Sequence, residues 1–552
     1  MPDPDDPSRR AVLKAGATAA GVLALGRADG LAAGLGRLEA ETLRLRRGAT
    51  GARGFRRRRR AALEYRRHCA TLATRRNRPL AVPVANGEET ELAGHVASFS
   101  KGLPHDALGH VDPAAYAALL AAVRSGDPAD FERIPMAGTL RLTSPQAGLA
   151  FDLEGPDAAS VALRPAPRFD SAENAAEMAE LYWMSLARDV PFAAYASDPT
   201  IAAAAADLSR FSDFRGPKEG GVVTPGTIFR GSAAGNLVGP FVSQFLWRDV
   251  PYGALRISAQ IATVLPGVDY LTRFDEWLAV QNGARSAGGD LPDLTPRYIR
   301  SLRDLAAWVH GDALYQAYLN ACLVLLALGA PLDPGLPPRR SRNQDGFVEF
   351  GAPHVLSLVT EVATRALKAV WFEKWFVHRR LRPEEFGGRV HNLLTGAVLY
   401  PIHRELLDSP VLGAVRDAHG SYLLPQAFPE GCPCHPAYGS GHATVAGACV
   451  TVLKAFFDDQ WVLPELVAPN ADGTRILRLD GPPLTVGGEL DKLAANVATG
   501  RNAAGIHWRT DFSEAILLGE AIALGILEEQ KLAHNERFTY SLTRFDGTRV
   551  TV

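Results

Sequence analysis

The 552-residue sequence predicts a mostly α-helical protein. Hydrophobic residues make up 47% of the chain, which is enough to bury a large core. Several long segments have apolar residues at the spacing of a helix and little of the alternation that marks a strand. These segments are 298–328, 354–381, 444–457 and 511–532. Glycine and proline gather between them, which predicts connecting loops at 283–296, 329–338 and 464–483.

The N-terminus has the pattern of a twin-arginine export signal. Ser8, Arg9 and Arg10 precede an uncharged run of small and apolar residues from Ala15 to Leu25. A membrane anchor is the alternative, but this run is shorter than the ~20 residues that cross a hydrocarbon core. We therefore expect residues 1–35 to be a signal peptide and the protein to be periplasmic or secreted.

A basic leader follows the signal. Arginine dominates residues 37–78, where Arg56 to Arg60 are consecutive and Glu64 is the only acid after Arg53. We expect residues 36–80 to be solvated and partly disordered, because such charges repel one another and bury nothing. A patch for nucleic acid or lipid is the alternative. Since the whole chain carries a formal net charge of only −1, we expect no nucleic-acid partner.

The remainder, residues 81–552, is expected to form a helical domain without a transmembrane span. Its strongly apolar stretch 320–332 has 13 residues, which suits a buried core helix better than a membrane crossing. Three short segments of this domain contain side chains with the chemistry of an active site.

The first segment runs from Lys374 to Pro383. Pro383 disfavours helical geometry at Arg382, so we expect a helix to stop there with Arg382 near its C-terminal end. Lys374 lies eight residues earlier, about two turns, on roughly the same side of that helix. Two cations can then converge on one pocket, although basic residues in the last turns also complement the helix dipole.

The second segment runs from His435 to Ala443. Gly439 and Gly441 permit a tight turn, and Ser440 favours a cap for the apolar helix that follows. The unpaired amides at the start of that helix form an anion site, where His442 can bond an oxyanion and exchange protons with it. An ordinary capped helix with a satisfied histidine is the alternative.

The third segment runs from Gly500 to Asp511. Arg501 offers a planar fork that suits paired oxygens, and His507 offers an imidazole that can ligate a metal or attack phosphorus. Alone, an arginine and a histidine six residues apart are more often surface residues. The ordered set of all three segments is the specific signal.

In that order the segments resemble the superfamily shared by type 2 phosphatidic acid phosphatases and vanadium haloperoxidases. The chain is also similar, from about Val84 to its end, to the vanadium bromoperoxidases of red and brown algae and their bacterial relatives, the red-algal ones most of all. The segments that show this similarity are 98–106, 148–158, 303–324, 355–370, 424–457 and 545–548.

The resemblance implies an all-α fold with two four-helix bundles forming the core, and an enzyme with a vanadate cofactor. His507 would be the metal ligand, and His442 the acid–base residue. The groups implied to hold the vanadate oxygens are Lys374, Arg382, Arg501, Ser440 and the amide of Gly441. Three fixed cations can offset a multiply charged oxyanion.

The implied reaction is the oxidation of bromide, or of chloride, by hydrogen peroxide to hypohalous acid, which halogenates small organic substrates. Lys374 would polarise a peroxide oxygen, which makes it catalytic together with His442 and His435. Trp371 and His435 would line the halide pocket. Trp371 lies three residues before Lys374 and should face the same pocket, where red-algal enzymes have arginine. Packing of Trp371 in the core is the alternative.

Two other functions are compatible with the same residues. One is an acid phosphatase, with His507 as nucleophile and His442 as leaving-group acid. The other is a non-catalytic oxyanion-binding protein that its basic leader tethers to anionic surfaces. The similarity over the whole chain, and His435, favour the peroxidase. Because red-algal members assemble as dodecamers built from dimers, the resemblance also implies a homodimer or a larger homo-oligomer.

Overall fold

The computed structural model describes residues 51–76, 82–285, 289 and 291–552. The chain divides into two compact units, one formed by residues up to 75 with 528–537 and the other by 76–527 with 538–552. The expected signal peptide, together with residues 36–50 and 77–80 of the expected leader, lies outside the described residues. None of the helices in the described part of the chain has the length and apolar content that a membrane crossing needs.

The arginine-rich segment is helical where it is described. Helix α2 spans Gly51–Arg76, and the side chains of Arg56 to Arg60 are exposed. The structure describes only residues 51–76 of the expected leader, so partial disorder of residues 36–80 stays a prediction. Arginine, alanine and leucine are good helix formers, and their propensity favours a helix even where no apolar face is buried.

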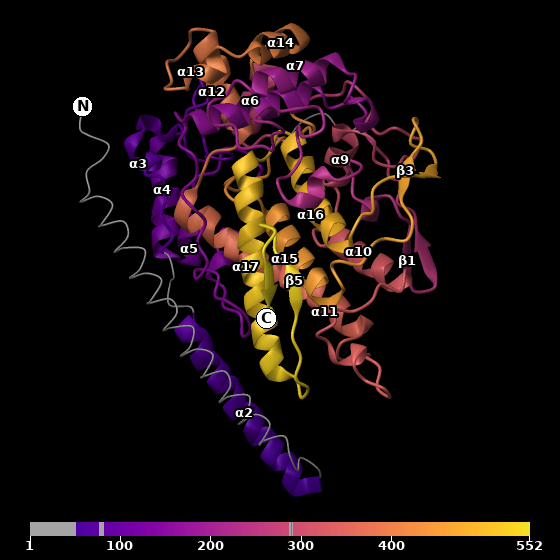
Figure 1. Cartoon of the computed structure of the whole chain (residues 1–552). Helices are drawn as coiled ribbons and strands as arrows, with labels where there is room; N and C mark the ends of the chain where they lie inside the picture. Colours follow the sequence, from indigo (N-terminus) through magenta and orange to yellow (C-terminus); the bar gives the residue numbers. More distant parts are fainter. Residues whose placement is uncertain (1–50, 77–81, 286–288, 290) are drawn as a thin grey trace, which may run out of the picture. The chain divides into compact units, whose positions relative to one another are not determined.

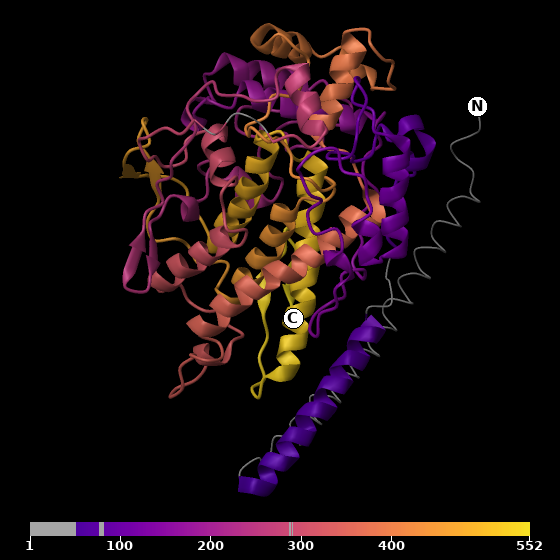
Figure 2. The same ribbon diagram turned by 180° about the vertical axis from the view of Figure 1, so that it is seen from behind.

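The large unit is built from helices, which confirms the predicted all-α class (Figures 1 and 2). Its helices are α3 (Glu88–Glu91), α4 (Pro113–Ser125), α5 (Pro128–Phe131), α6 (Ala172–Leu186), α7 (Pro199–Leu208), α8 (Phe274–Gln281), α9 (Leu302–Trp308), α10 (Gln316–Ala327), α11 (Ala352–Phe372), α12 (Pro383–Leu394), α13 (Arg404–Leu407), α14 (Pro410–His419), α15 (Gly441–Phe456) and α16 (Val486–Ala503). Helix α17 (Arg509–Ala533) begins in this unit.

Strands are confined to three short antiparallel hairpins in the described residues. They pair β1 (Val250–Tyr252) with β2 (Leu255–Ile257), β3 (Val467–Pro469) with β4 (Ile476–Arg478), and β5 (Ser541–Thr543) with β6 (Arg549–Thr551). Each hairpin is two strands wide, so none of them provides a sheet on which the core is built.

The core lies between α11, α15, α16 and α17, and α11 crosses the other three obliquely (Figures 1 and 2). Helix α15 packs against α11 and α16, and α16 packs against α9. Glycines let α15 and α17 approach closely: a Cβ on Gly447 would lie 2.0 Å from the carbonyl oxygen of Ile516. Helix α15 is almost entirely buried, which fixes the position of its N-terminus.

The predicted helix 298–328 is two helices. Helix α9 ends at Trp308 and α10 begins at Gln316, with a turn between them that contains Gly311. Apolar periodicity continues across this break because both helices face the same core. The turn places the carbonyl of Val309 and the carboxylate of Asp312 beside side chains of the third and second segments.

The predicted helix 354–381 also ends early. Helix α11 stops at Phe372 and continues as one π-helical turn, η7 (Glu373–His378). Arg379 then adopts a left-handed conformation with φ of 39°, and Arg382 is the N-cap of α12. The expectation that Arg382 lies near a helix C-terminus is wrong, because Pro383 starts a new helix at its first position.

The contact between α15 and α17 generates a stability prediction. A Cβ on Gly519 would lie 2.0 Å from the carbonyl oxygen of Thr444, so Gly519→Ala should force two buried backbones apart and destabilise the protein by about 3 kcal/mol. Gly413→Ala is the matched control, because nothing lies within 4 Å of its Cβ on exposed α14. It should be neutral or stabilise by about 0.5–1 kcal/mol. Urea unfolding measures both changes, and equal stabilities would contradict the packing described.

Candidate active site

Lys374 and Arg382 meet in the interior, as the sequence predicts. Both side chains are fully buried. The ammonium of Lys374, on η7, donates to the carbonyl oxygens of Pro436 and Ala437, both at 2.8 Å. The first predicted segment therefore contacts the second directly.

The guanidinium of Arg382 connects all three segments. Its Nε donates to the carbonyl oxygen of His435 at 2.9 Å, and one terminal nitrogen lies 2.9 Å from Nδ1 of the same residue. The other terminal nitrogen donates to the carbonyl oxygen of Ile506 at 3.0 Å and lies 3.1 Å from Nε2 of His507. Residues far apart in the sequence thus contact one planar group.

The second segment forms the turn before α15. Ser440 is the N-cap of this helix, and its hydroxyl accepts from the amide of Ala443. A Cβ on Gly441 would lie 3.0 Å from the Trp371 ring, so glycine permits a close approach of the backbone to the first segment. His442, at the start of α15, has its Nε2 3.0 Å from Oδ1 of Asp312.

The third segment provides Arg501, near the end of α16, and His507, just before α17. One terminal nitrogen of Arg501 donates to the carbonyl oxygen of Val309 at 2.9 Å, whereas its buried Nε has no hydrogen-bond partner among the described residues. Nδ1 of His507 lies 2.8 Å from Oδ2 of Asp511. A carboxylate accepts only, so Nδ1 carries the hydrogen and Nε2 has the lone pair.

The electrostatics of this pocket favour an anion. Among the described residues, Lys374, Arg382 and Arg501 bond to carbonyl oxygens or imidazoles and form no ion pair with a carboxylate. Burial lowers the pKa of Lys374 well below its usual value, and Arg382 and Arg501 lower it further. Burial lowers the pKa of Arg501 to about 10. A bound oxyanion would relieve this unfavourable burial of positive charge.

The environment of the three histidines favours their neutral forms. Burial, with Arg382 and Lys374 next in importance, lowers the pKa values of His507 and His435 well below the usual range. Burial and Arg501 also lower the pKa of His442. An imidazole whose Nε2 lone pair faces the cations suits a metal ligand, and the surrounding cations and capped helix suit the oxygens of vanadate. These residues therefore fit the cofactor that the sequence implies.

Trp371 and His435 lie side by side at this pocket. Their ring centroids are 4.8 Å apart, and Nζ of Lys374 lies 5.7 Å from the indole ring. The indole Nε1 donates to the carbonyl oxygen of Thr143 at 3.0 Å. Trp371 is thus held over the pocket residues in addition to packing against the small apolar cluster that contains Trp375.

Three residues of the site were not identified from the sequence. Asp511 orients His507, Asp312 binds His442, and Arg380 donates to Asp511 at 3.1 Å. The four-residue spacing of His507 and Asp511 at a helix start was a usable signal. No comparable sequence signal indicates Asp312, because it lies 130 residues from His442 along the chain.

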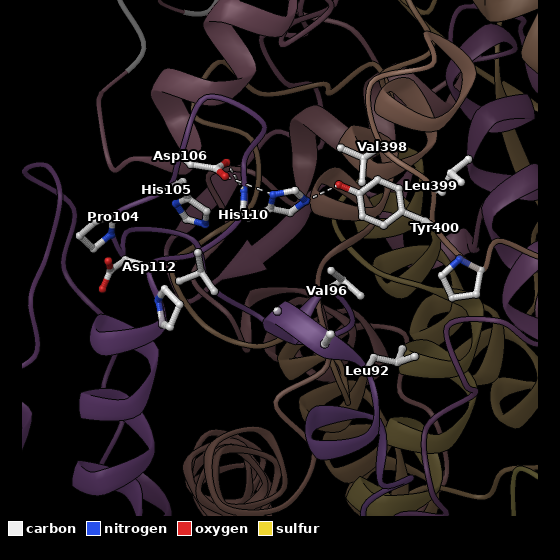
Figure 3. A pocket seen from close by; sticks show the side chains of 15 residues that line it. Leu92, Val96, Pro104, His105, Asp106, His110, Asp112, Val398, Leu399 and Tyr400 are labelled. Atoms are coloured by element: carbon white, nitrogen blue, oxygen red, sulfur yellow. Dashed lines mark hydrogen bonds and ion pairs between the residues drawn. The ribbon is translucent and has the colours of Figure 1, made fainter.

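A separate surface hollow of about 750 Å³ contains none of the predicted site residues (Figure 3). Its polar side chains include His110, whose Nδ1 lies 3.2 Å from Asp106 and whose Nε2 lies 2.7 Å from the hydroxyl of Tyr400. Apolar side chains form much of the remaining wall, including Leu92, Val96, Val398 and Leu399. No cluster of three metal-binding side chains is found here or elsewhere in the described residues.

Comparison with known proteins identifies relatives along most of the chain. The vanadium-dependent bromoperoxidase of Corallina pilulifera is 40% identical, over 86% of this chain and 96% of the relative. The vanadium-dependent bromoperoxidase of Ascophyllum nodosum is 38% identical, over 84% of this chain and 87% of the relative.

Structure and family comparisons agree with these relatives. The homohexameric structure of the second vanadate-dependent bromoperoxidase from Ascophyllum nodosum matches with a TM-score of 0.84 at 29% identity, over 90% of each chain. Residues 410–535 match the family model described as the VCPO second helical-bundle domain. The chain belongs to the vanadium-dependent bromoperoxidase family.

Proposed function

We propose that the pocket described above binds vanadate and that His507 is its metal ligand. Lys374, Arg382 and Arg501 would bind the oxygens, together with the hydroxyl of Ser440 and the amide of Gly441. The single observation that carries this proposal is the convergence of three buried cations, none of them paired with a carboxylate of the described residues, on the imidazole of His507. The chain is an enzyme that oxidises bromide with hydrogen peroxide, and its cofactor is vanadate.

Each residue has a defined task in this reaction. Bound vanadate supplies the Lewis acidity that activates peroxide towards a halide. Lys374 donates hydrogen bonds from Nζ. The carbonyl oxygens of Pro436 and Ala437, which it contacts, fix the direction of its ammonium group. Asp511 holds His507 in the tautomer that presents Nε2. Asp312 binds Nε2 of His442, which leaves Nδ1 of that neutral ring to accept or return a proton.

The acid phosphatase remains the competing function, because a phosphate ester would use the same cations and His507 as nucleophile. The family relationship supports the peroxidase. Activity measured with and without vanadate separates the two, since a phosphatase would need no vanadium.

The wild-type chain, freed of vanadate, should brominate monochlorodimedone with peroxide and bromide only after vanadate is added. His507→Ala should lower this activity by more than about 100-fold, since even outer partners of metal ligands contribute 10- to 100-fold. His110→Ala is the matched control, a partly exposed histidine outside the site, and should keep wild-type turnover. Phosphate-ester hydrolysis without vanadate-dependent bromination would instead establish the phosphatase, and near-normal turnover in His507→Ala would remove its role as ligand.

Trp371 and His435 form the proposed halide pocket. The indole lies against His435 and close to Nζ of Lys374, so a halide there would meet an uncharged ring beside a cation. A drier pocket strengthens the polarisation by Lys374. Chloride is harder to oxidise than bromide, and such a pocket favours its use. We propose a bromoperoxidase with measurable chloride oxidation at mildly acidic pH.

Trp371→Arg should lower the ratio of chloride to bromide kcat/KM by about tenfold, because the added charge stabilises the halide against oxidation and draws water into the pocket. Steady-state kinetics with each halide measure the ratio. Trp371→Phe is the control, since it keeps an uncharged ring and should keep the ratio. A ratio unchanged in Trp371→Arg, with vanadate still bound, would leave Trp371 as a packing residue only.

We also propose that the mature enzyme is exported by the twin-arginine route, assembles from at least two chains, and releases hypohalous acid that halogenates small organic molecules. Ser8, Arg9 and Arg10 before the apolar run support export, and the homohexameric relative supports assembly.

One sample tests export and assembly. Protein isolated from outside the cytoplasm should lack residues near 1–35 and have a native mass of two or more chains. Arg9→Lys with Arg10→Lys should keep the protein in the cytoplasm, because the twin-arginine pair is read by the export receptor. Native mass spectrometry gives both the N-terminus and the chain number; a full-length monomer outside the cell would contradict both proposals.

A further inference from the structure

Lys374 lies within a turn of unusual geometry. In η7 the backbone changes from the α-helical to the π-helical pattern, and the amide of Arg379 donates to the carbonyl oxygen of Lys374 at 3.0 Å, across five residues. Such single π-helical turns are rare and often mark functional sites. The sequence signal for this turn is weak, so its cause must lie in side-chain contacts.

Glu373 and His378 form a contact that spans this turn. Nε2 of His378 lies 2.9 Å from Oε2 of Glu373, and the two side chains are 1% and 0% exposed. Both carboxylate oxygens of Glu373 and both ring nitrogens of His378 are buried without a hydrogen-bond partner among the described residues, so this close contact is the polar interaction that the two side chains share. Each group therefore depends on the other, because a buried polar group without a partner is costly.

This pair can form only in the π-helical turn. Five residues of an α-helix rotate by about 500°, which places side chains at that spacing about 140° apart around the axis. The wider π-helical turn, with its five-residue hydrogen bond, brings residues 373 and 378 over one another. An α-helical turn here would separate the pair and leave a carboxylate buried alone.

The geometry of the turn determines where Lys374 points. A register change of one residue would rotate its side chain by about 100°, away from the carbonyls of Pro436 and Ala437 and from Arg382. The ring of His378 also meets Tyr438 edge-on at 4.8 Å, two residues before Ser440. The pair thus contacts both the turn that contains Lys374 and the loop that contains Ser440.

We propose that Glu373 and His378 are a positioning pair that holds η7 in its π-helical form and thereby aims Lys374 at the bound oxyanion. This inference rests on the proposed function, since it takes vanadate as the anion. Neither residue touches the anion in this account. Both act through Lys374 and the Ser440 loop.

Vanadate binding to the full chain, measured by equilibrium dialysis alongside thermal unfolding, tests the pair. Glu373→Leu should weaken vanadate binding by about tenfold or more, as loss of an outer partner of a ligand does. Glu373→Gln keeps the size of the side chain and an oxygen that faces Nε2 of His378, so it should stay near wild-type affinity. Glu489→Leu is the matched control: it breaks an equally buried pair with Lys492 on α16 and should lower Tm without changing the affinity.

The double variant Glu373→Met with His378→Phe separates positioning from stability. It removes both polar groups together, so it should regain much of the Tm that Glu373→Leu loses, while vanadate binding stays weak. The positioning role would be overturned if Glu373→Leu bound vanadate with wild-type affinity. It would also be overturned if the double variant regained vanadate affinity together with Tm. Either result would leave the proposed function intact. A wild-type chain that bound no vanadate would overturn the proposed function as well.

Discussion

The buried guanidinium of Arg382 is the contact on which the site depends. Its nitrogens reach the carbonyl and the ring of His435, the carbonyl of Ile506 and the ring of His507. These partners belong to segments 53 to 125 residues away along the chain. A lysine could not replace it, because only a planar fork with five donors reaches so many acceptors in fixed directions.

Burial of three cations in one pocket is unfavourable, and the fold reduces the cost in two ways. Carbonyl oxygens solvate the cations directly, as Pro436 and Ala437 do for Lys374. The carboxylates of Asp511 and Asp312 contact the imidazoles of His507 and His442, and these imidazoles lie between the carboxylates and the cations. Because these carboxylates bond to the imidazoles, the three cations form no ion pair within the described residues, and a bound oxyanion would supply the missing negative charge.

Much of this arrangement could be predicted from the sequence. Arg382 contacts His435 and His507, and Lys374 contacts the loop before Ser440, because motif order in a known family predicts which segments converge. The all-α class followed from apolar periodicity. The start of α12 at Pro383 was missed, because the rule that the residue before proline leaves the helix does not say whether a new helix begins there.

Other features depend on contacts that no local pattern encodes. The break between α9 and α10 lies in a continuous apolar pattern, and its turn brings the carbonyl of Val309 to Arg501 and the carboxylate of Asp312 to His442. The π-helical turn at Lys374 depends on the meeting of Glu373 and His378, which the α-helical spacing forbids. The run of charges predicted that Arg56 to Arg60 are solvated but gave no sign of their helix, which intrinsic helix propensity favours.

The most direct test of the central claim is a crystal structure of the vanadate-loaded protein at a resolution that separates nitrogen from oxygen ligands. The account predicts one bond from vanadium to Nε2 of His507, with the vanadate oxygens within hydrogen-bond distance of Lys374, Arg382 and Arg501. Vanadate bound elsewhere, for example in the hollow beside His110 and Tyr400, or bound without His507, would contradict it.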